Sequence, residues 1–160
     1  MKNEQGFSLV ELLIVVAIIA IIAAIAIPSL LTSKMAANEA AAMQGCRTLG
    51  SAEIAFAATN NQNYTDVATL VTGNFVDSRF NNGAGFNGYI YAAAASISGT
   101  TLAGAPPASF GFTATPSGTN GRYIYGIAPD QVVRYLGPVN GATPPVGLEQ
   151  GDPIGKGKAQ

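Results

Sequence analysis

Residues 12–31 read LLIVVAIIAIIAAIAIPSLL, and no charged side chain occurs between Leu12 and Ser33. At a rise of about 1.5 Å per residue, a helix of this length crosses the roughly 30 Å hydrocarbon core of a bilayer. Its side chains are apolar on every side, so it needs lipid or tightly packed neighbouring helices all around it. The stretch therefore predicts a helix that serves as a membrane anchor, as the core of an assembly, or as both.

One carboxylate, Glu11, comes directly before this uncharged stretch. An ionisable side chain at membrane depth costs about 3 kcal/mol or more, so it is a functional hypothesis by default. The alternative is that Glu11 lies at the depth of the lipid headgroups and is merely tolerated. A secretory signal peptide does not fit, because its cleavage site follows a short apolar core, whereas Gly6 precedes a long one. A plain signal anchor fits the length but leaves Glu11 unexplained.

The run GFSLVE, from Gly6 to Glu11, followed by the long apolar helix, resembles the class III (prepilin) signal of type IV pilins and type II secretion pseudopilins. This resemblance is specific over residues 6–28. It implies that a prepilin peptidase cuts between Gly6 and Phe7 on the cytoplasmic side and methylates the new amine of Phe7. It also implies that Glu11 pairs with the N-terminal amine of a neighbouring subunit during assembly. An unpaired charge in a low-dielectric core is costly, so such a pair would set the axial register between subunits.

Pro28 falls where many pilins carry a helix-kinking proline. It removes one backbone hydrogen bond, which predicts either a simple bend or a hinge that melts on assembly. Beyond Lys34 strong helix formers continue, and apolar residues recur at helical spacing on one face. We therefore expect one helix from Phe7 to about Thr59, uniformly apolar in its first half and amphipathic in its second. The apolar face of the second half consists of Met35, Ala42, Cys46, Leu49 and Phe56.

The remaining chain reads as a short helix followed by strands and turns. The short helix covers residues 66–71, capped at Thr65 or Asp66. Strand-like runs cover residues 88–97, 109–115, 122–127 and 131–136, the last two forming a hairpin through residues 128–130. Asn-Gly pairs mark tight turns; there are four, Asn82-Gly83, Asn87-Gly88, Asn120-Gly121 and Asn140-Gly141. Residues 137–160 are rich in Gly and Pro and read as irregular.

The predicted fold class is α+β: a pilin-like ladle, in which the long N-terminal helix packs on a small antiparallel sheet of about four strands. Three segments follow from this reading. Residues 1–6 are the prepilin leader, which is cleaved, and residues 7–33 are the transmembrane and assembly half of the helix. Residues 34–160 form a periplasmic or extracellular globular head that includes the amphipathic half of the helix.

Several classes of function are disfavoured. The chain has no His and a single cysteine, so neither an intrachain disulfide, nor a Cys/His metal site, nor the usual nucleophile–base pair of an enzyme is available. We expect no enzyme activity, no cofactor and no metal. Cys46 reads as a small buried hydrophobe. The formal net charge of −1 gives no electrostatic basis for nucleic-acid binding. Three carboxylates near the C-terminus lack the spacing of a calcium loop and read as solvated: Asp130, Glu149 and Asp152.

The function predicted from these features is a structural subunit of a type IV pilus-like filament. The precursor would lie in the inner membrane as a single-pass protein, its N-terminus cytoplasmic and its head periplasmic, before joining a cell-surface pilus. Its partners would be identical subunits, the prepilin peptidase, the pilus or secretion machinery of the inner membrane and, before assembly, the lipid bilayer. One alternative is a pseudopilin of a type II secretion system. Another, of a different class, is a monomeric membrane-anchored binding domain.

Overall fold

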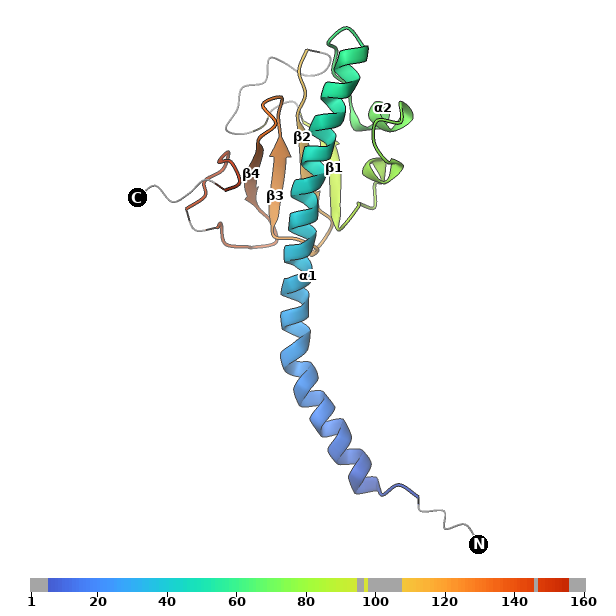
Figure 1. Ribbon diagram of the computed structural model, residues 1–160. Helices are drawn as coiled ribbons and strands as arrows, with labels where there is room; N and C mark the ends of the chain where they lie inside the picture. Colours follow the sequence, from blue (N-terminus) through green and yellow to red (C-terminus); the bar gives the residue numbers. More distant parts are fainter. Residues whose placement is uncertain (1–5, 95–96, 98–107, 146, 156–160) are drawn as a thin grey trace. The chain divides into compact units, whose positions relative to one another are not determined.

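The computed structural model describes residues 6–94, 97, 108–145 and 147–155. Residues 1–5, which belong to the predicted leader, and residues 156–160 lie outside this range. The chain forms two compact units, Met1–Lys34 and Met35–Gln160, and helix α1 contributes residues to both. In chain order the elements are α1 (Leu9–Thr59), α2 (Val67–Thr72), the short 3₁₀ helix η1 (Ser78–Asn81), β1 (Tyr89–Ala93), β2 (Phe112–Pro116), β3 (Tyr123–Ile127) and β4 (Val133–Pro138) (Figure 1).

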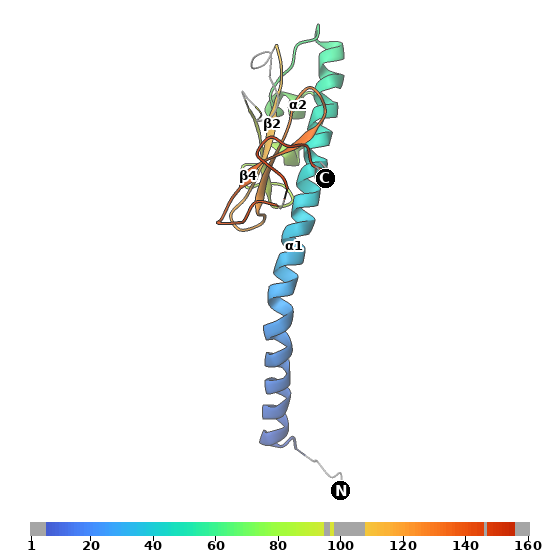
Figure 2. The ribbon, with the colours of Figure 1, turned by 90° about the vertical axis from the view of Figure 1, so that its left-hand side faces the viewer.

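In the second unit the four strands form one antiparallel sheet in the order β1-β2-β3-β4, which is the predicted meander. The part of α1 that belongs to this unit crosses one face of the sheet (Figures 1 and 2). Strands β3 and β4 are joined by the predicted turn, in which the Gln131 N–H donates to the Ala128 carbonyl at 2.9 Å. The predicted α+β arrangement of a long N-terminal helix with a four-stranded antiparallel sheet is thus confirmed.

Several boundaries differ from those predicted. Helix α1 begins at Leu9, two residues later than expected, and β1 ends at Ala93 instead of continuing to residue 97; residues 95 and 96 lie outside the described range. The 3₁₀ helix η1 was not predicted. It starts where the Asp77 carboxylate accepts a 2.8 Å hydrogen bond from the Arg79 N–H, a local cap too short to leave a periodic apolar pattern.

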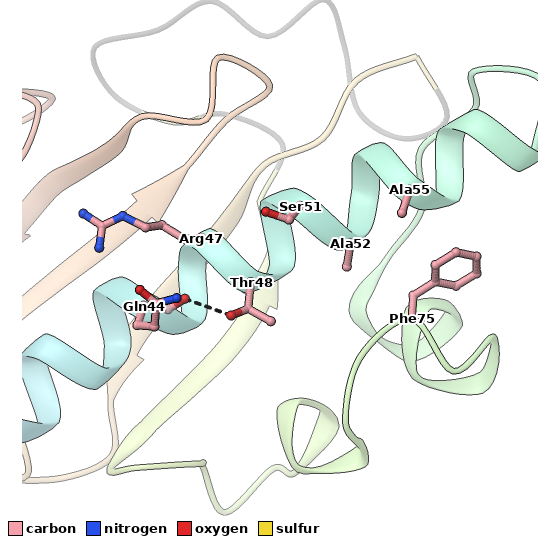
Figure 3. Close-up of a pocket in the computed structure, with 7 residues that line it drawn as sticks. All are labelled: Gln44, Arg47, Thr48, Ser51, Ala52, Ala55 and Phe75. Carbon is pink, nitrogen blue, oxygen red and sulfur yellow. Dashed lines mark hydrogen bonds between the residues drawn. The ribbon is translucent and has the colours of Figure 1, made fainter.

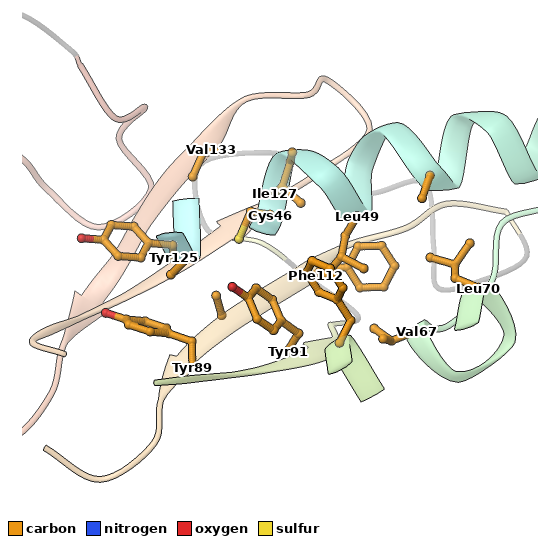
Figure 4. Close-up of a cluster of buried hydrophobic side chains, with 14 of the residues drawn as sticks. Cys46, Leu49, Val67, Leu70, Tyr89, Tyr91, Phe112, Tyr125, Ile127 and Val133 are labelled. Carbon is orange, nitrogen blue, oxygen red and sulfur yellow. The ribbon is translucent and has the colours of Figure 1, made fainter. Parts of the chain in front are cut away.

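The core of the second unit lies between α1 and the sheet (Figure 4). Ala42, Cys46 and Leu49 follow one another at helical spacing and have no exposed surface. Burial raises the pKa of the Cys46 thiol to about 12, so it stays protonated and packs as a small apolar side chain. Alternate strand residues cover the facing side of the sheet: Tyr89, Tyr91, Phe112, Ala114, Tyr125, Ile127, Val133 and Tyr135.

Two glycines let α1 approach the sheet closely. A Cβ atom at Gly45 would lie only 2.6 Å from Cζ of Tyr91, and one at Gly50 would lie 2.7 Å from Oε1 of Gln131. Each glycine costs the helix up to about 1 kcal/mol relative to alanine. The cost is offset by packing, because the Tyr91 ring and the Gln131 side chain fill the space that a larger residue would occupy.

An ion pair with one buried and one partly exposed partner fixes α1 to the turn between β2 and β3. The Glu39 side chain is 8% exposed and accepts three hydrogen bonds from Arg122: from its backbone N–H at 3.0 Å, and from Nε and Nη2 at 2.9 Å. Beside it, the Asn38 amide donates to the Asn120 carbonyl at 2.9 Å. Removing either charged partner would leave the other partly buried and unpaired, which is costly.

The chain was predicted to be irregular from residue 137, but β4 includes residues 137 and 138. The described residues after β4 are irregular, as predicted, yet they are held against the edge of the sheet. Backbone hydrogen bonds join it to β4, from Tyr135 N–H to the Asp152 carbonyl at 3.0 Å and from Ile154 N–H to the Val133 carbonyl at 2.9 Å. The Gly151 N–H adds a third bond, to the Tyr135 carbonyl at 2.8 Å. Part of the outer edge of β4 is therefore covered, which reduces its exposure to pairing with other chains.

A second buried carboxylate, Glu53, has a different environment from Glu39. Its side chain is fully buried, and both of its oxygens face one donor, the backbone N–H of Thr65, at 3.1 and 3.2 Å. Desolvation by burial raises its pKa from an ordinary 4.5 to about 7, opposed by the Thr65 hydrogen bond and assisted by the nearby Asp66. The folded protein therefore binds a proton at Glu53 more tightly than the unfolded chain does.

We expect Glu53 to make the second unit less stable as the pH rises. Because the folded-state pKa is raised, its contribution is fully present below about pH 4.5 and is lost as the pH passes through about 7. The decrease in the free energy of unfolding should be at most about 3 kcal/mol. Glu53→Gln should remove this part of the pH dependence, measured by denaturant unfolding of the full chain in detergent micelles between pH 5 and 8 at ~25 °C.

Glu149→Gln is the matched control, since Glu149 is exposed and its removal should leave the pH dependence unchanged. If the free energy of unfolding changes equally with pH in the wild type and in Glu53→Gln, the raised pKa of Glu53 is contradicted.

Candidate functional site

The predicted cleavage site lies in irregular chain before α1. Gly6, Phe7 and Ser8 are all exposed, and Phe7 is 90% exposed. A Cβ atom at Gly6 would have no other heavy atom within 4 Å. The peptide bond between Gly6 and Phe7 is therefore neither folded into the helix nor covered by the described part of the chain. An accessible bond of this kind is what a peptidase needs.

Glu11 lies in the first turn of α1, where it closes a capping box with Ser8. The Ser8 N–H donates to Oε2 of Glu11 at 2.9 Å, and the Val10 N–H donates to Oγ of Ser8 at 3.3 Å. Both bonds satisfy amide groups that a helix N-terminus leaves without partners. This local bonding explains why α1 begins at Leu9 and not at Phe7.

Ser8 is the residue at this site that the sequence reasoning missed. The signal was present, because Ser-x-x-Glu immediately before an apolar run is the pattern of a capping box. The predicted pair joins Glu11 to the N-terminal amine of a neighbouring subunit and stays a prediction. In the uncut chain the nitrogen of Phe7 is part of the peptide bond to Gly6. The capping bond occupies Oε2 of Glu11, and no described residue donates a hydrogen bond to Oε1.

The apolar surface of the first unit is uncovered. Its large side chains are exposed by about half or more of their surface, with Ile25 at 74% and Leu30 at 70%. Within the described residues, α1 is the one helix long and apolar enough to cross a membrane. Exposed apolar area on this scale is unfavourable in water, so lipid or other protein has to cover it.

Pro28 lies inside α1, and hydroxyl groups follow it within two turns. Oγ1 of Thr32 donates to the Ser29 carbonyl at 2.9 Å, and Oγ of Ser33 donates to the same carbonyl at 2.9 Å. These hydroxyls are satisfied within the helix and add no unpaired polar group to its apolar surface. Such back-bonding often accompanies helix bends, and a kink at Pro28 stays a prediction.

An open groove lies on the outer side of α1 in the second unit and has a volume of about 430 Å³. The Thr48 hydroxyl donates to the Gln44 carbonyl at 3.1 Å, an ordinary bond within the helix. Among the described residues that line the groove there is no carboxylate, thiol or imidazole, so it offers no pair of groups for acid–base chemistry. Figure 3 shows the lining residues, which are Gln44, Arg47, Thr48, Ser51, Ala52, Ala55 and Phe75.

The three C-terminal carboxylates do not converge. Asp130 forms an ion pair with Arg134 at 2.5 Å, and Oδ2 of Asp152 accepts a 2.9 Å hydrogen bond from the backbone N–H of Glu149. Over residues 6–94, 97, 108–145 and 147–155, no group of three or more His, Cys, Asp or Glu side chains is arranged to hold a metal ion.

Comparison with known proteins finds two similarities. Residues 1–27 match the family model of the prokaryotic N-terminal methylation motif. The type IV wide pilus major component PilA4 of Thermus thermophilus is 51% identical to this chain over 39 residues, which are 24% of this chain and 30% of that protein. The match thus spans less than a third of the relative. Over residues 1–27 the chain carries the prokaryotic N-terminal methylation motif, and the predicted resemblance to type IV pilins is confirmed.

Proposed function

We propose that this chain is a structural subunit of a type IV pilus-like filament. The observation that carries the proposal is the first unit, an uncovered apolar helix that starts with one carboxylate and follows an accessible Gly-Phe bond. Residues 1–6 are a leader that a prepilin peptidase removes, residues 7–33 anchor the precursor in the inner membrane, and residues 34–160 form the head outside it.

The apolar helix supplies the adhesion between subunits in this proposal. When the subunit leaves the membrane, its exposed Leu, Ile and Val side chains lose their contact with lipid and need another apolar environment. A bundle of the same helices offers that environment on every side. The many alanines between residues 17 and 26 allow neighbouring helices to approach closely.

Glu11 supplies the register in this proposal. The capping box holds its carboxylate at the start of α1 with Oε2 bonded to the Ser8 N–H, which leaves Oε1 for the methylated amine of Phe7 in a neighbouring subunit. A buried charge without a partner is strongly unfavourable. Subunits docked one helical turn out of place would leave both charges unpaired, so the pair disfavours wrong registers.

The experiment that tests the proposal is electron microscopy of material sheared from the surface of cells that produce this chain, with mass spectrometry of its main protein. We expect long filaments built mainly from the chain without residues 1–6. Recovery of the chain only from the envelope fraction, with short assemblies at most, would favour the pseudopilin alternative. A monodisperse monomer after extraction, with an uncut N-terminus, would favour the membrane-anchored binding domain.

Gly6→Leu should block cleavage, because a bulky side chain at this position would occupy the space that the peptidase needs around the scissile bond. We expect intact-mass analysis to find the full precursor in the inner membrane and no processed chain. Gln5→Leu places the same bulk one residue earlier and serves as the control for insertion. Normal processing of the Gly6→Leu chain would contradict the cleavage site.

Glu11→Gln should leave insertion intact and reduce filament yield. Glutamine keeps a side-chain oxygen for the Ser8 N–H but carries no charge, so only the proposed pairing is lost. We expect at least about a tenfold loss of sheared filaments, the change that ~1.4 kcal/mol of pairing free energy produces. The comparison variant Glu11→Val loses the cap as well. Wild-type filament yield from cells making only Glu11→Gln would remove the register role, even if the filament itself is observed.

A further inference from the structure

The four Asn-Gly pairs carry a chemistry that the proposed function does not use. The backbone nitrogen of a residue that follows asparagine can attack the asparagine side-chain amide, and glycine hinders this attack least because it has no side chain. In a folded chain the reaction also needs freedom to rotate about the asparagine backbone and side chain. The structure therefore decides which of the four pairs is able to react.

In two of the four asparagines the side-chain nitrogen, which has to leave in this reaction, donates a hydrogen bond. The side-chain amide of Asn120 donates to the Ser117 carbonyl at 2.7 Å, and that of Asn140 donates to the Gly118 carbonyl at 2.8 Å. Asn140 also has a left-handed backbone, with φ 54°. Either side chain would have to give up its donor bonds before the attack on its amide carbon.

A third pair, Asn87-Gly88, forms a rigid two-residue turn. Phe86 and Tyr89 exchange two backbone hydrogen bonds across it, at 2.7 and 3.1 Å. Asn87 and Gly88 both have positive φ, 53° and 75°, as the tight turn predicted from the sequence requires. The α-carbon of Gly88 is also crowded, since a Cβ atom there would lie 2.8 Å from Nδ2 of Asn38. Rotation at this turn would disrupt both bonds and meet that neighbour.

Asn82-Gly83 is the least restrained pair. Asn82 is exposed, and its side-chain nitrogen donates to no described residue. A Cβ atom at Gly83 would have nothing within 4 Å, so the space beside the α-carbon of Gly83 is open. From its present ψ of 112°, Asn82 has to break one backbone bond, the 2.8 Å bond from the Gly85 N–H to its carbonyl.

One contact at this pair also favours the chemistry directly. The Ala84 N–H donates to Oδ1 of Asn82 at 3.0 Å. When a nucleophile adds to the side-chain amide carbon, negative charge develops on that oxygen, and a hydrogen-bond donor aimed at it stabilises the charge. The contact has to persist while the backbone rotates, which is possible because Ala84 belongs to the same exposed turn.

We propose that Asn82 is a self-modification site at which the side-chain amide is converted to a carboxylate through a cyclic imide with Gly83. The Gly83 nitrogen loses its proton to water or hydroxide and forms a bond to Cγ of Asn82. The side-chain nitrogen takes up a proton from water, its bond to Cγ breaks, and ammonia leaves. Water then opens the imide at either carbonyl, giving aspartate or isoaspartate at position 82, with no oxidant or reductant involved.

The product changes the head in two ways. It adds one negative charge to a chain whose formal net charge is −1. The isoaspartate form also inserts an extra backbone atom into the turn that the Gly85 N–H closes, immediately before the Phe86–Tyr89 hairpin. A head that stays folded for a long time would thus acquire this charge at one defined surface position. The inference does not depend on filament formation.

The test follows all four asparagines in one sample. The full chain in detergent micelles is incubated in warm, mildly alkaline buffer, and peptide mapping by mass spectrometry measures conversion at Asn82, Asn87, Asn120 and Asn140. We expect Asn82 to convert at least about tenfold faster than the other three, because local structure protects them. In urea the four rates should converge, since every pair is then an unrestrained Asn-Gly.

A matched variant separates the chemistry from the fold. Gly83→Ala fits the open space at position 83 and hinders only the attacking nitrogen, so it should slow conversion at Asn82 and leave the other three rates unchanged. The proposal is overturned if the folded chain converts another asparagine as fast as Asn82, or if Gly83→Ala leaves the Asn82 rate unchanged.

Discussion

An apolar helix that its own chain does not cover has to be covered by something else, and this constraint governs the first unit. Burying such side chains is worth about 25 cal/mol for each Å² of apolar surface, so lipid or other protein is strongly preferred to water. Several polar groups in the described part of this unit are bonded within the helix. Ser8 and Glu11 cap its first turn, and the hydroxyls of Thr32 and Ser33 donate to a carbonyl of their own helix.

The second unit has a different constraint, because here α1 has to bury one face against a sheet. Small residues make this approach possible, and Gly45 accommodates the Tyr91 ring directly. Two carboxylates are buried on this face of α1, and their hydrogen-bond partners differ. Glu39 has the Arg122 guanidinium as its partner, whereas both oxygens of Glu53 face a single backbone N–H. The first buried charge fixes a position, and the second couples folding to pH.

The outline of the fold could be predicted because its signals are local. The uncharged run at residues 12–31, the helical spacing of Ala42, Cys46 and Leu49, and the turn at residues 128–130 each lie within a few residues of one another. The capping box of Ser8 was equally local and would have been found from its Ser-x-x-Glu pattern. The 3₁₀ helix and the backbone bonds between the C-terminal segment and β4 leave no periodic pattern, so nothing in the sequence marked them.

By itself the sequence determined the apolar helix, the order of the strands and the motif at the N-terminus, because each depends on composition and spacing along the chain. Only the tertiary structure decided which polar groups meet. Glu39 and Arg122 are 83 residues apart, and their pairing depends on how α1 lies on the sheet. The same holds for the Asn-Gly pairs, which are identical as dipeptides and differ only in the bonds and neighbours that the folded chain gives them. Which side chains pair and which become buried depends on the distances between them in the folded chain, and spacing along the sequence does not specify those distances.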